Sequence, residues 1–264
     1  MRFPEGFRPQ LIALDLDDTL VSHDGSVIEA AVDAIARCQE AGIMVVAATG
    51  RSISTTHPVC HAAGMLDWAV CSNGAMLTSV TPDEIVETVT FDPAVLLEQI
   101  APLLPNATYA VEDVHGVFHT NQDLRTSALG MSVRVVPFEH LLADPVVRLV
   151  VRSEEHRDIG LGHIAADLGL HSVVFGAGDV AWLDIGPKGV NKATMLQRLC
   201  DLRGYDPART LAIGDSWNDT AMLMWAGLGV AMDTAPPQVK AAADTVTNGT
   251  PGEGVADVLD ALIL

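Results

Sequence analysis

Three carboxylates lie within four residues at the end of an apolar run, in the stretch LIALDLDDTLVS. If the predicted strand continues through Asp15 and Asp17, their side chains point to the same face, while Leu16 points into packing. Two carboxylates so close together resist joint ionisation unless a cation neutralises them. A compact site with oxygen ligands only favours Mg²⁺, which usually shares its ligands with a substrate phosphate. We therefore expect Asp15 and Asp17 to bind Mg²⁺, with Asp215 supplying a third carboxylate.

Other polar residues expected at strand ends suit the binding of a phosphate group. Thr49 and Gly50 follow a second apolar run and offer a hydroxyl and main-chain N–H groups to anionic oxygens. Lys192 and Asn218 offer an ammonium group and an amide to the same oxygens. Lys188 is a second lysine nearby, but Lys192 fits the start of a helix better.

This combination of residues predicts phosphoryl transfer. An aspartate held against a phosphoryl group by metal and lysine can act as a nucleophile and form an aspartyl-phosphate. A second aspartate can then serve as acid to the leaving alkoxide and as base to the hydrolytic water. A single acid after a strand is common in turns, but two acidic clusters, a Thr-Gly pair and a lysine together indicate an active site. Asp18, on the opposite face by alternation, is expected to serve a turn.

A parallel sheet would position these residues, because ligands of open α/β sheets bind outside the carboxyl ends of the strands. Helical patterns alternate with apolar runs, and the first helix is expected to begin with a capping box of Ser26 and Glu29 and to end at Gly42. A second helix is expected to break near Pro58. The runs that predict buried strands are 11–16, 43–48, 68–71, 209–215 and 228–232.

The pattern changes after Val80 and resumes near residue 186. Between them we expect a helix at 93–103, a helix at 154–168, a hairpin at 171–186 and short strands at 107–112, 116–120 and 146–153. The hairpins indicate a separate α+β unit. The predicted fold class is therefore α/β, with a Rossmann-like parallel-sheet core of residues 1–81 and 186–264 and an inserted domain of residues 82–185.

Composition excludes several classes of partner. The 264 residues are 49% hydrophobic and carry a formal net charge of −19, which argues against nucleic acid and against an anionic membrane surface. No apolar run reaches the roughly 20 residues that span a bilayer. The four cysteines show no CxxC spacing, as is typical of reduced thiols. We expect a cytoplasmic monomer or small homo-oligomer whose partner is a small-molecule phosphate ester.

Four histidines offer weaker signals. His57 and His61 have the spacing of a helical metal pair, but the chain has no HExxH motif and Pro58 lies between them, so packing is favoured. His115 and His119 flank a predicted hairpin, where surface or packing positions are favoured over substrate contact.

Four motifs carry a resemblance to a known family. They are DLDDT from Asp15, ATGR from Ala48, GPKGVNKATML around Lys192 and GDSWNDTAML from Gly214. Their types and order resemble the motifs of the haloacid dehalogenase superfamily, and their spacing resembles its Cof-type phosphatase subfamily, as do SNGA, GVAM and EGVADVL. The resemblance covers about residues 10–80 and 186–260. The middle resembles the α/β cap of that subfamily only in length and place.

The resemblance implies a Mg²⁺-dependent phosphatase with Asp15 as nucleophile and metal ligand. Asp17 would be the acid/base and would bind Mg²⁺ through its main-chain carbonyl. This second aspartate also disfavours haloacid dehalogenation. Thr234 departs from the family, which often has Asn there. The other implied roles are phosphoryl binding by Thr49 and Lys192, phosphate contact by Asn218, Mg²⁺ binding by Asp215, and orientation of Lys192 or support of the metal by Asp219.

The leading interpretation is a phosphatase for a small phosphorylated metabolite, for example a sugar phosphate, with the inserted domain closing over the site and selecting the leaving group. One alternative is a phosphomutase of the same fold, which would return the phosphoryl group to a sugar. Another is a catalytically silent metabolite-binding protein, which the complete set of acidic and basic residues disfavours.

Overall fold

The computed structural model describes residues 3–4, 6–22, 25–122, 132–153, 171–177 and 180–263. By its internal contacts the chain forms two compact units. The core unit comprises Met1–Arg51, Thr56–Val86 and Asn191–Leu264, and the inserted unit comprises Ser52–Thr55 and Glu87–Val190. The domain boundaries expected after residues 81 and 185 remain a prediction.

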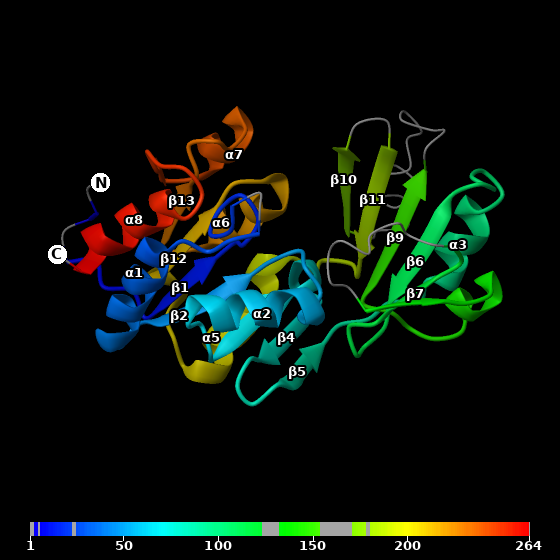
Figure 1. The fold of residues 1–264 in the computed structure, drawn as a ribbon, viewed down its shortest axis with the longest axis horizontal. Coiled ribbons are helices and arrows are strands. Elements are labelled where there is room, and N and C mark those ends of the chain that lie inside the picture. Colours follow the sequence, from blue (N-terminus) through cyan, green and yellow to red (C-terminus); the bar gives the residue numbers. More distant parts are fainter. Residues whose placement is uncertain are drawn as a thin grey trace. The chain divides into compact units, whose positions relative to one another are not determined.

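An eight-stranded sheet organises the core unit, in the order β14-β13-β12-β1-β2-β3-β4-β5 (Figure 1). The strands from β14 to β3 pair in parallel, and β4 pairs antiparallel with β3. The four central strands are short and almost wholly buried, as their continuous apolar runs predict. The strands are β1 Leu11–Leu14, β2 Met44–Ala48, β3 Trp68–Cys71, β4 Met76–Ser79, β5 Glu84–Thr88, β12 Thr210–Gly214, β13 Leu228–Ala231 and β14 Thr245–Val246.

Amphipathic helices alternate with these strands (Figure 1). The first buries Ala31, Ala34, Ile35 and Cys38, the spacing of one helical face. It packs against the C-terminal helix α8, while α5 packs beside α6 and against β3 and β4. The helices are α1 Glu29–Glu40, α2 Ile53–Ala63, α5 Lys192–Arg203, α6 Thr220–Trp225, α7 Pro237–Ala242 and α8 Glu253–Ile263.

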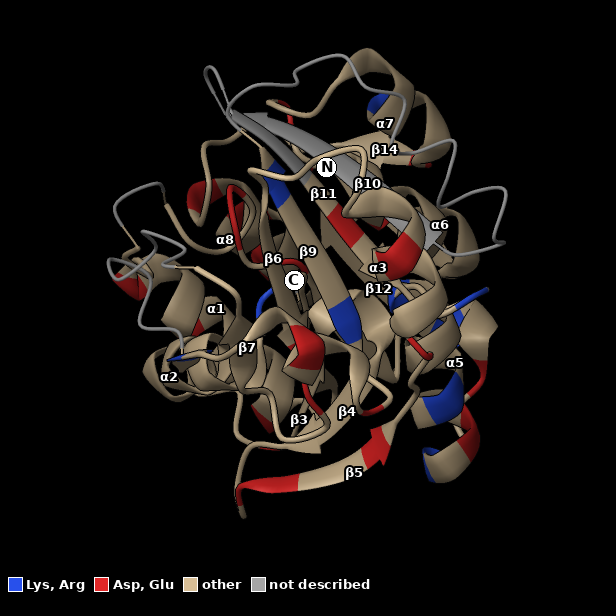
Figure 2. Ribbon diagram, turned by 90° about the vertical axis from the view of Figure 1, so that its right-hand side faces the viewer, with Lys and Arg blue, Asp and Glu red and all other residues tan. Residues whose placement is uncertain are grey.

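The inserted unit has its own six-stranded sheet, in the order β10-β11-β9-β6-β7-β8. Its pairs are antiparallel except β7 with β8. One face packs Tyr109 and Val111 with Leu97 of helix α3, Ala94–Ile100. Arg148 of β9 pairs with Glu112 at 2.7 Å, and Figure 2 shows basic residues along β9. The strands are β6 Thr108–Glu112, β7 Phe118–Thr120, β8 Val133–Val135, β9 Arg148–Ser153, β10 His171–Ala177 and β11 Val180–Gly186.

The predicted fold class is confirmed, with a mainly parallel core sheet and a separate mixed sheet. The hairpin expected at 171–186 is also confirmed, since β10 and β11 pair antiparallel. The predicted helix at 154–168 lies outside the described residues.

Two local predictions were wrong. Helix α1 begins at Glu29, and its N-cap is Ile28 without a side-chain cap, because Val27 is still held in an extended bridge to Val21. Helix α2 continues through Pro58. Proline removes one helical N–H bond there, but the helix is held by its buried face, which includes Val59 and Cys60.

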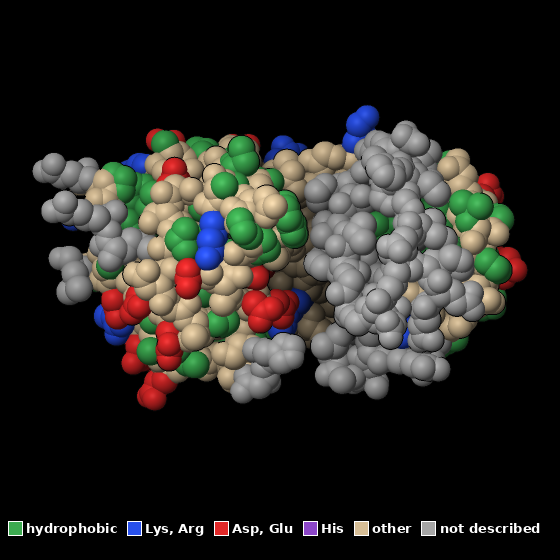
Figure 3. Space-filling view, turned by 90° about the horizontal axis from the view of Figure 1, so that it is seen from above, with side chains coloured by type: hydrophobic (Ala, Val, Ile, Leu, Met, Phe, Trp, Pro, Cys, Tyr) green, Lys and Arg blue, Asp and Glu red, His purple; other side chains and the backbone are tan. Residues whose placement is uncertain are grey.

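Acidic residues occur in both units. Figure 2 marks them along the backbone of each unit, and Figure 3 shows more acidic than basic side chains on the part of the core unit that it draws in colour. In the described part of the chain, no helix combines the length and the apolar character that crossing a bilayer requires.

Gly74 allows the loop after β3 to touch the start of α5. Its φ is +97°, and a Cβ atom there would lie 2.1 Å from the carbonyl oxygen of Asn191. Gly204, the C-cap of α5, also has a positive φ, of 68°, but no atom lies within 4 Å of the corresponding Cβ position. A side chain at either glycine would strain the backbone, but only a side chain at Gly74 would also collide with neighbouring atoms.

We predict that Gly74→Ala destabilises the protein more than Gly204→Ala. The second change should cost about 1–2 kcal/mol, because alanine must adopt a left-handed backbone. The first adds a collision with main-chain atoms that cannot rotate away. Urea unfolding of the two variants measures the difference, and equal losses would contradict the close approach.

Candidate active site

Three neighbouring parallel strands bring their carboxyl ends to one edge of the core sheet. Asp15 follows β1, Thr49 follows β2, and Asp215 follows β12. β1 lies between the other two and pairs in parallel with both. The main-chain N–H of Asp15 continues the ladder by donating to Ile213 at 2.9 Å. The expected convergence of these residues at one rim is therefore a consequence of strand order.

A buried lysine joins two of the aspartates. Lys192 is the first residue of α5, whose N-cap Asn191 accepts a hydrogen bond from the N–H of Thr194. Its ammonium group donates to Asp15 Oδ1 at 2.5 Å and to Asp219 Oδ1 at 2.6 Å. The lysine and Asp219 are fully buried, and Asp15 is 4% exposed. Lys188, the alternative weighed from the sequence, is exposed.

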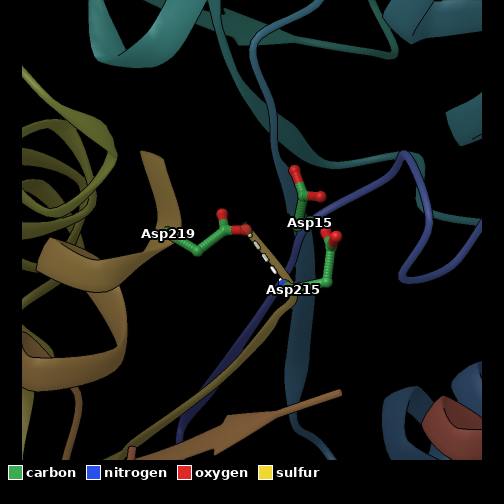
Figure 4. Close-up of side chains that lie close together, drawn as sticks. All are labelled: Asp15, Asp215 and Asp219. Carbon is green, nitrogen blue, oxygen red and sulfur yellow. Dashed lines mark hydrogen bonds between the residues drawn. The ribbon is translucent and has the colours of Figure 1, made fainter. Parts of the chain in front are cut away.

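Asp219 also fixes the loop that carries Asp215. It ends a short 3₁₀ turn, Trp217–Asp219, directly before α6. Its second oxygen, Oδ2, accepts the N–H groups of Asp215 at 3.1 Å and Ser216 at 2.9 Å. Figure 4 shows the bond to Asp215 as a dashed line. Both oxygens of Asp219 are thus engaged by protein donors, which makes this residue a support for its neighbours.

Asp15, Asp215 and Asp219 form the acidic cluster that could hold a cation. One oxygen from each lies within 4.8 Å of the others, and Figure 4 shows the three carboxylates converging. Because Asp219 is tied to the protein, Asp15 and Asp215 are the better ligands. Asp215 also accepts the hydroxyl of Thr19 at 3.2 Å, a support that sequence reasoning missed although Thr19 ends the DLDDT motif.

The pKa values show the electrostatic strain of this cluster. Burial and then the charge of Asp219 raise the pKa of Asp15 well above its usual value, although Lys192 acts against them. Burial and Asp219 likewise raise the pKa of Asp215 to about 6. Burial alone would lower the pKa of Lys192, but Asp15 and Asp219 outweigh it and raise that pKa. One ammonium group faces three carboxylates, so a bound divalent cation would relieve the repulsion.

Asp17 lies differently from Asp15, and the alternation expected from the sequence was wrong. β1 ends at Leu14, so neither aspartate is in the strand. The Asp17 side chain is 58% exposed and accepts the Nε–H of Arg51 at 2.9 Å. Its carboxylate is not part of the acidic cluster. Asp18 is exposed with a φ of 56°, and its N–H donates to Val21, which confirms its place in a turn.

The remaining predicted residues form a polar rim around the same edge. The Thr49 hydroxyl accepts the N–H of Arg51 at 3.1 Å, and its carbonyl accepts the N–H of Asn73 at 3.1 Å. Asn218 donates its amide to Asn73 Oδ1 at 3.0 Å. Gly50 lies close to this amide, because a Cβ there would stand 3.0 Å from Asn73 Oδ1. Asn73 thus links the two predicted phosphate-binding loops.

Two of the four histidines set aside from the sequence have partners away from the acidic cluster. One ring nitrogen of His57 is 2.9 Å from the Thr78 hydroxyl and the other is 3.1 Å from Asp83, which confirms the packing interpretation for His57. His119 in the inserted unit pairs with Asp113 at 2.9 Å.

Known proteins resemble this chain over nearly its full length. The model of the haloacid dehalogenase-like hydrolase family matches residues 12–259. The pyridoxal phosphate phosphatase YbhA of Escherichia coli is 26% identical, and the alignment covers 95% of this chain and 97% of that protein. The 5-amino-6-(5-phospho-D-ribitylamino)uracil phosphatase YitU of Bacillus subtilis is 27% identical, with 96% and 97% covered. These matches extend through the inserted unit.

A solved structure agrees with the sequence comparison. A phosphatase of the haloalkanoate enzyme superfamily from Bacteroides thetaiotaomicron superposes with a TM-score of 0.81 at 25% identity, covering 100% of this chain and 99% of the other. The shared architecture therefore includes both units of the chain.

We predict that Asp215→Asn raises the melting temperature of the metal-free protein at pH 7.5, because the amide cannot repel Asp15 and Asp219. The folded-state pKa of about 6 exceeds the usual value of about 3.9. Between these values the folded protein binds more protons than the unfolded chain, so wild-type stability rises as the pH falls. The difference in melting temperature between Asp215→Asn and the wild type should therefore shrink below about pH 6.

Thermal unfolding in EDTA measures this effect. Asp233→Asn is the control, because Asp233 is exposed and pairs only with Lys240 among the described contacts of its side chain. It should give no gain. A melting temperature of Asp215→Asn below that of the wild type at pH 7.5 would contradict the strain assigned to the cluster.

Proposed function

The chain belongs to the haloacid dehalogenase-like hydrolase family, and we propose that it is a Mg²⁺-dependent phosphatase that hydrolyses a small phosphorylated metabolite through an aspartyl-phosphate on Asp15. The observation that carries this proposal is the buried contact of Lys192 with Asp15 and Asp219 at 2.5 and 2.6 Å, beside Asp215. It combines a nucleophile, a fixed positive charge and an acidic pair in one water-poor site.

The metal would be held by Asp15 and Asp215, with the main-chain carbonyl of Asp17 as the further ligand implied by the sequence motif. Oxygen donors alone suit Mg²⁺, and a divalent cation would offset the burial and the mutual repulsion that raise the pKa values of Asp15 and Asp215. When bound, the ion supplies charge neutralisation for the phosphoryl oxygens.

The chain's own residues would carry the covalent steps. A carboxylate oxygen of Asp15 attacks phosphorus, and the bond from phosphorus to the leaving oxygen breaks. Asp17 donates a proton to that oxygen and then takes one from the water that attacks the aspartyl-phosphate, which releases phosphate and restores Asp15. The exposure of Asp17 would let the substrate reach its carboxyl group, and its contact with Arg51 would open when it takes up this role.

Lys192, Thr49 and Asn218 would position the phosphoryl group. The ammonium group of Lys192 neutralises charge on Asp15 and on the transferred group. The Thr49 hydroxyl and the N–H groups around Gly50 would bind phosphoryl oxygens. Asp219 would act on the reaction only by orienting Lys192 and the loop of Asp215, since its own oxygens are already engaged.

The choice of substrate would depend on the inserted domain. Two relatives are named for different substrates, pyridoxal phosphate and a phosphorylated ribitylaminouracil. Each combines a phosphate ester with a different organic body. We assign recognition of the phosphate to the core residues and recognition of the body to the predicted domain of residues 82–185, with a sugar phosphate as the candidate substrate.

We predict that Asp15→Asn lowers turnover of p-nitrophenyl phosphate in Mg²⁺ by at least about 10³-fold, because the amide cannot form the phosphoryl ester. Asp18→Asn is the matched control. It changes the same group three residues on, and asparagine tolerates the positive φ. Circular dichroism should show both variants folded. Near-normal turnover by Asp15→Asn would contradict the proposal that Asp15 is the nucleophile.

Removal of the metal should abolish turnover, and added Mg²⁺ should restore it. The Mg²⁺ concentration for half-maximal rate should rise as the pH falls below about 6, because Asp215 must lose its proton to bind the ion. Rate measurements across pH 5–8 with increasing Mg²⁺ test this. Equal Mg²⁺ requirements at pH 5 and pH 8 would contradict the assignment of Asp215.

A panel of phosphorylated metabolites with phosphate release as the readout would identify the substrate class. Free phosphate from a member of the panel supports the hydrolase. An isomerised hexose phosphate without free phosphate would instead indicate a phosphomutase, and no reaction across the panel would indicate a binding protein.

A further inference from the structure

A cavity lies at the edge of the core sheet opposite the one that carries the acidic cluster. It has a volume of about 460 Å³, and its lining includes Arg8, Ile43, Tyr205 and Arg209. Ile43 directly precedes β2 and Arg209 directly precedes β12. The cavity therefore opens at the amino ends of the strands. The four residues of β1, at about 3.3 Å each, separate it from the active-site edge by roughly 13 Å.

Two arginines give this cavity a positive charge that is unusual for the chain. The sequence has 34 acidic and 15 basic residues, yet neither guanidinium group pairs with a carboxylate of the described residues. Arg209 Nε donates to the carbonyl of Arg8 at 3.1 Å, and Arg8 Nη1 donates to the carbonyl of Phe7 at 3.1 Å. Each guanidinium has five N–H donors, so most of them remain available to a ligand.

Apolar side chains line one side of the cavity. Tyr205 and Ile43 are half-buried, Leu262 is buried, and Ile263 completes this side of the cavity. None of the described residues that line the cavity is acidic. The cavity volume falls within the usual range for small-molecule sites.

We propose that this cavity is a second ligand site, which binds a phosphate monoester carried on an aromatic or apolar body. Two guanidinium groups match the charge of a dianionic phosphate and bind its oxygens as a fork. Tyr205 and the aliphatic side chains offer contact area to the body. The described lining offers neither a carboxylate nucleophile nor acidic metal ligands, so the site binds without turnover.

Isothermal titration calorimetry in EDTA with adenosine monophosphate as the probe tests the proposal. The double variant Arg8→Ala/Arg209→Ala should bind the probe at least about tenfold more weakly than the wild type, because it loses the charge-assisted hydrogen bonds. Adenosine and inorganic phosphate should each bind more weakly than adenosine monophosphate, since each lacks half of the recognised chemistry.

Arg134→Ala is the matched control, because it removes an exposed guanidinium from β8 of the inserted unit. It should bind the probe as the wild type does. Both variants should turn over p-nitrophenyl phosphate at the wild-type rate and melt at the wild-type temperature, since both arginines of the cavity are exposed. Three results would each overturn the site: unchanged affinity in the double variant, equal affinity for adenosine or inorganic phosphate, or no binding by the wild type at millimolar probe.

Discussion

The contact of the Lys192 ammonium with Asp15 and Asp219 is the interaction on which the site depends. It joins the end of β1, the start of α5 and the turn before α6, which are far apart in the sequence. Buried ion pairs contribute little net stability, because the groups must leave water. Loss of one partner, however, leaves an uncompensated charge inside the protein. The lysine is therefore best understood as fixing one arrangement of the carboxylates.

The sheet supplies what this lysine requires. With β1 between β2 and β12, a single edge receives Asp15, Thr49 and Asp215, each directly after a strand. Burial and the mutual repulsion of Asp15, Asp215 and Asp219 raise the pKa values of Asp15 and Asp215. A bound cation would relieve this strain. Stability and function thus oppose each other at these residues.

The sequence predicted well both the core strands and the residues at their carboxyl ends. Both are visible in short stretches of consecutive residues, where an apolar run is followed directly by the residues of a motif. It placed Asp17 wrongly, since the end of β1 and the contact with Arg51 depend on how two separate loops meet. It also assigned no contact to Asn73, which accepts the amide of Asn218, 145 positions away in the sequence. The capping box at Ser26 was not found, because the bridge between Val21 and Val27 keeps the chain extended there and the helix begins only at Glu29.

The close approach of Gly74 to Asn191 has a consequence for how such chains diversify. The segment between them leaves the core unit and returns to it, and both of its ends are held by the packing of core residues. The entropy of closing a loop grows only with the logarithm of its length, so insertions between these fixed points would perturb the core little. The inserted segment can thus be replaced in evolution while the core unit keeps the residues that act on the phosphate.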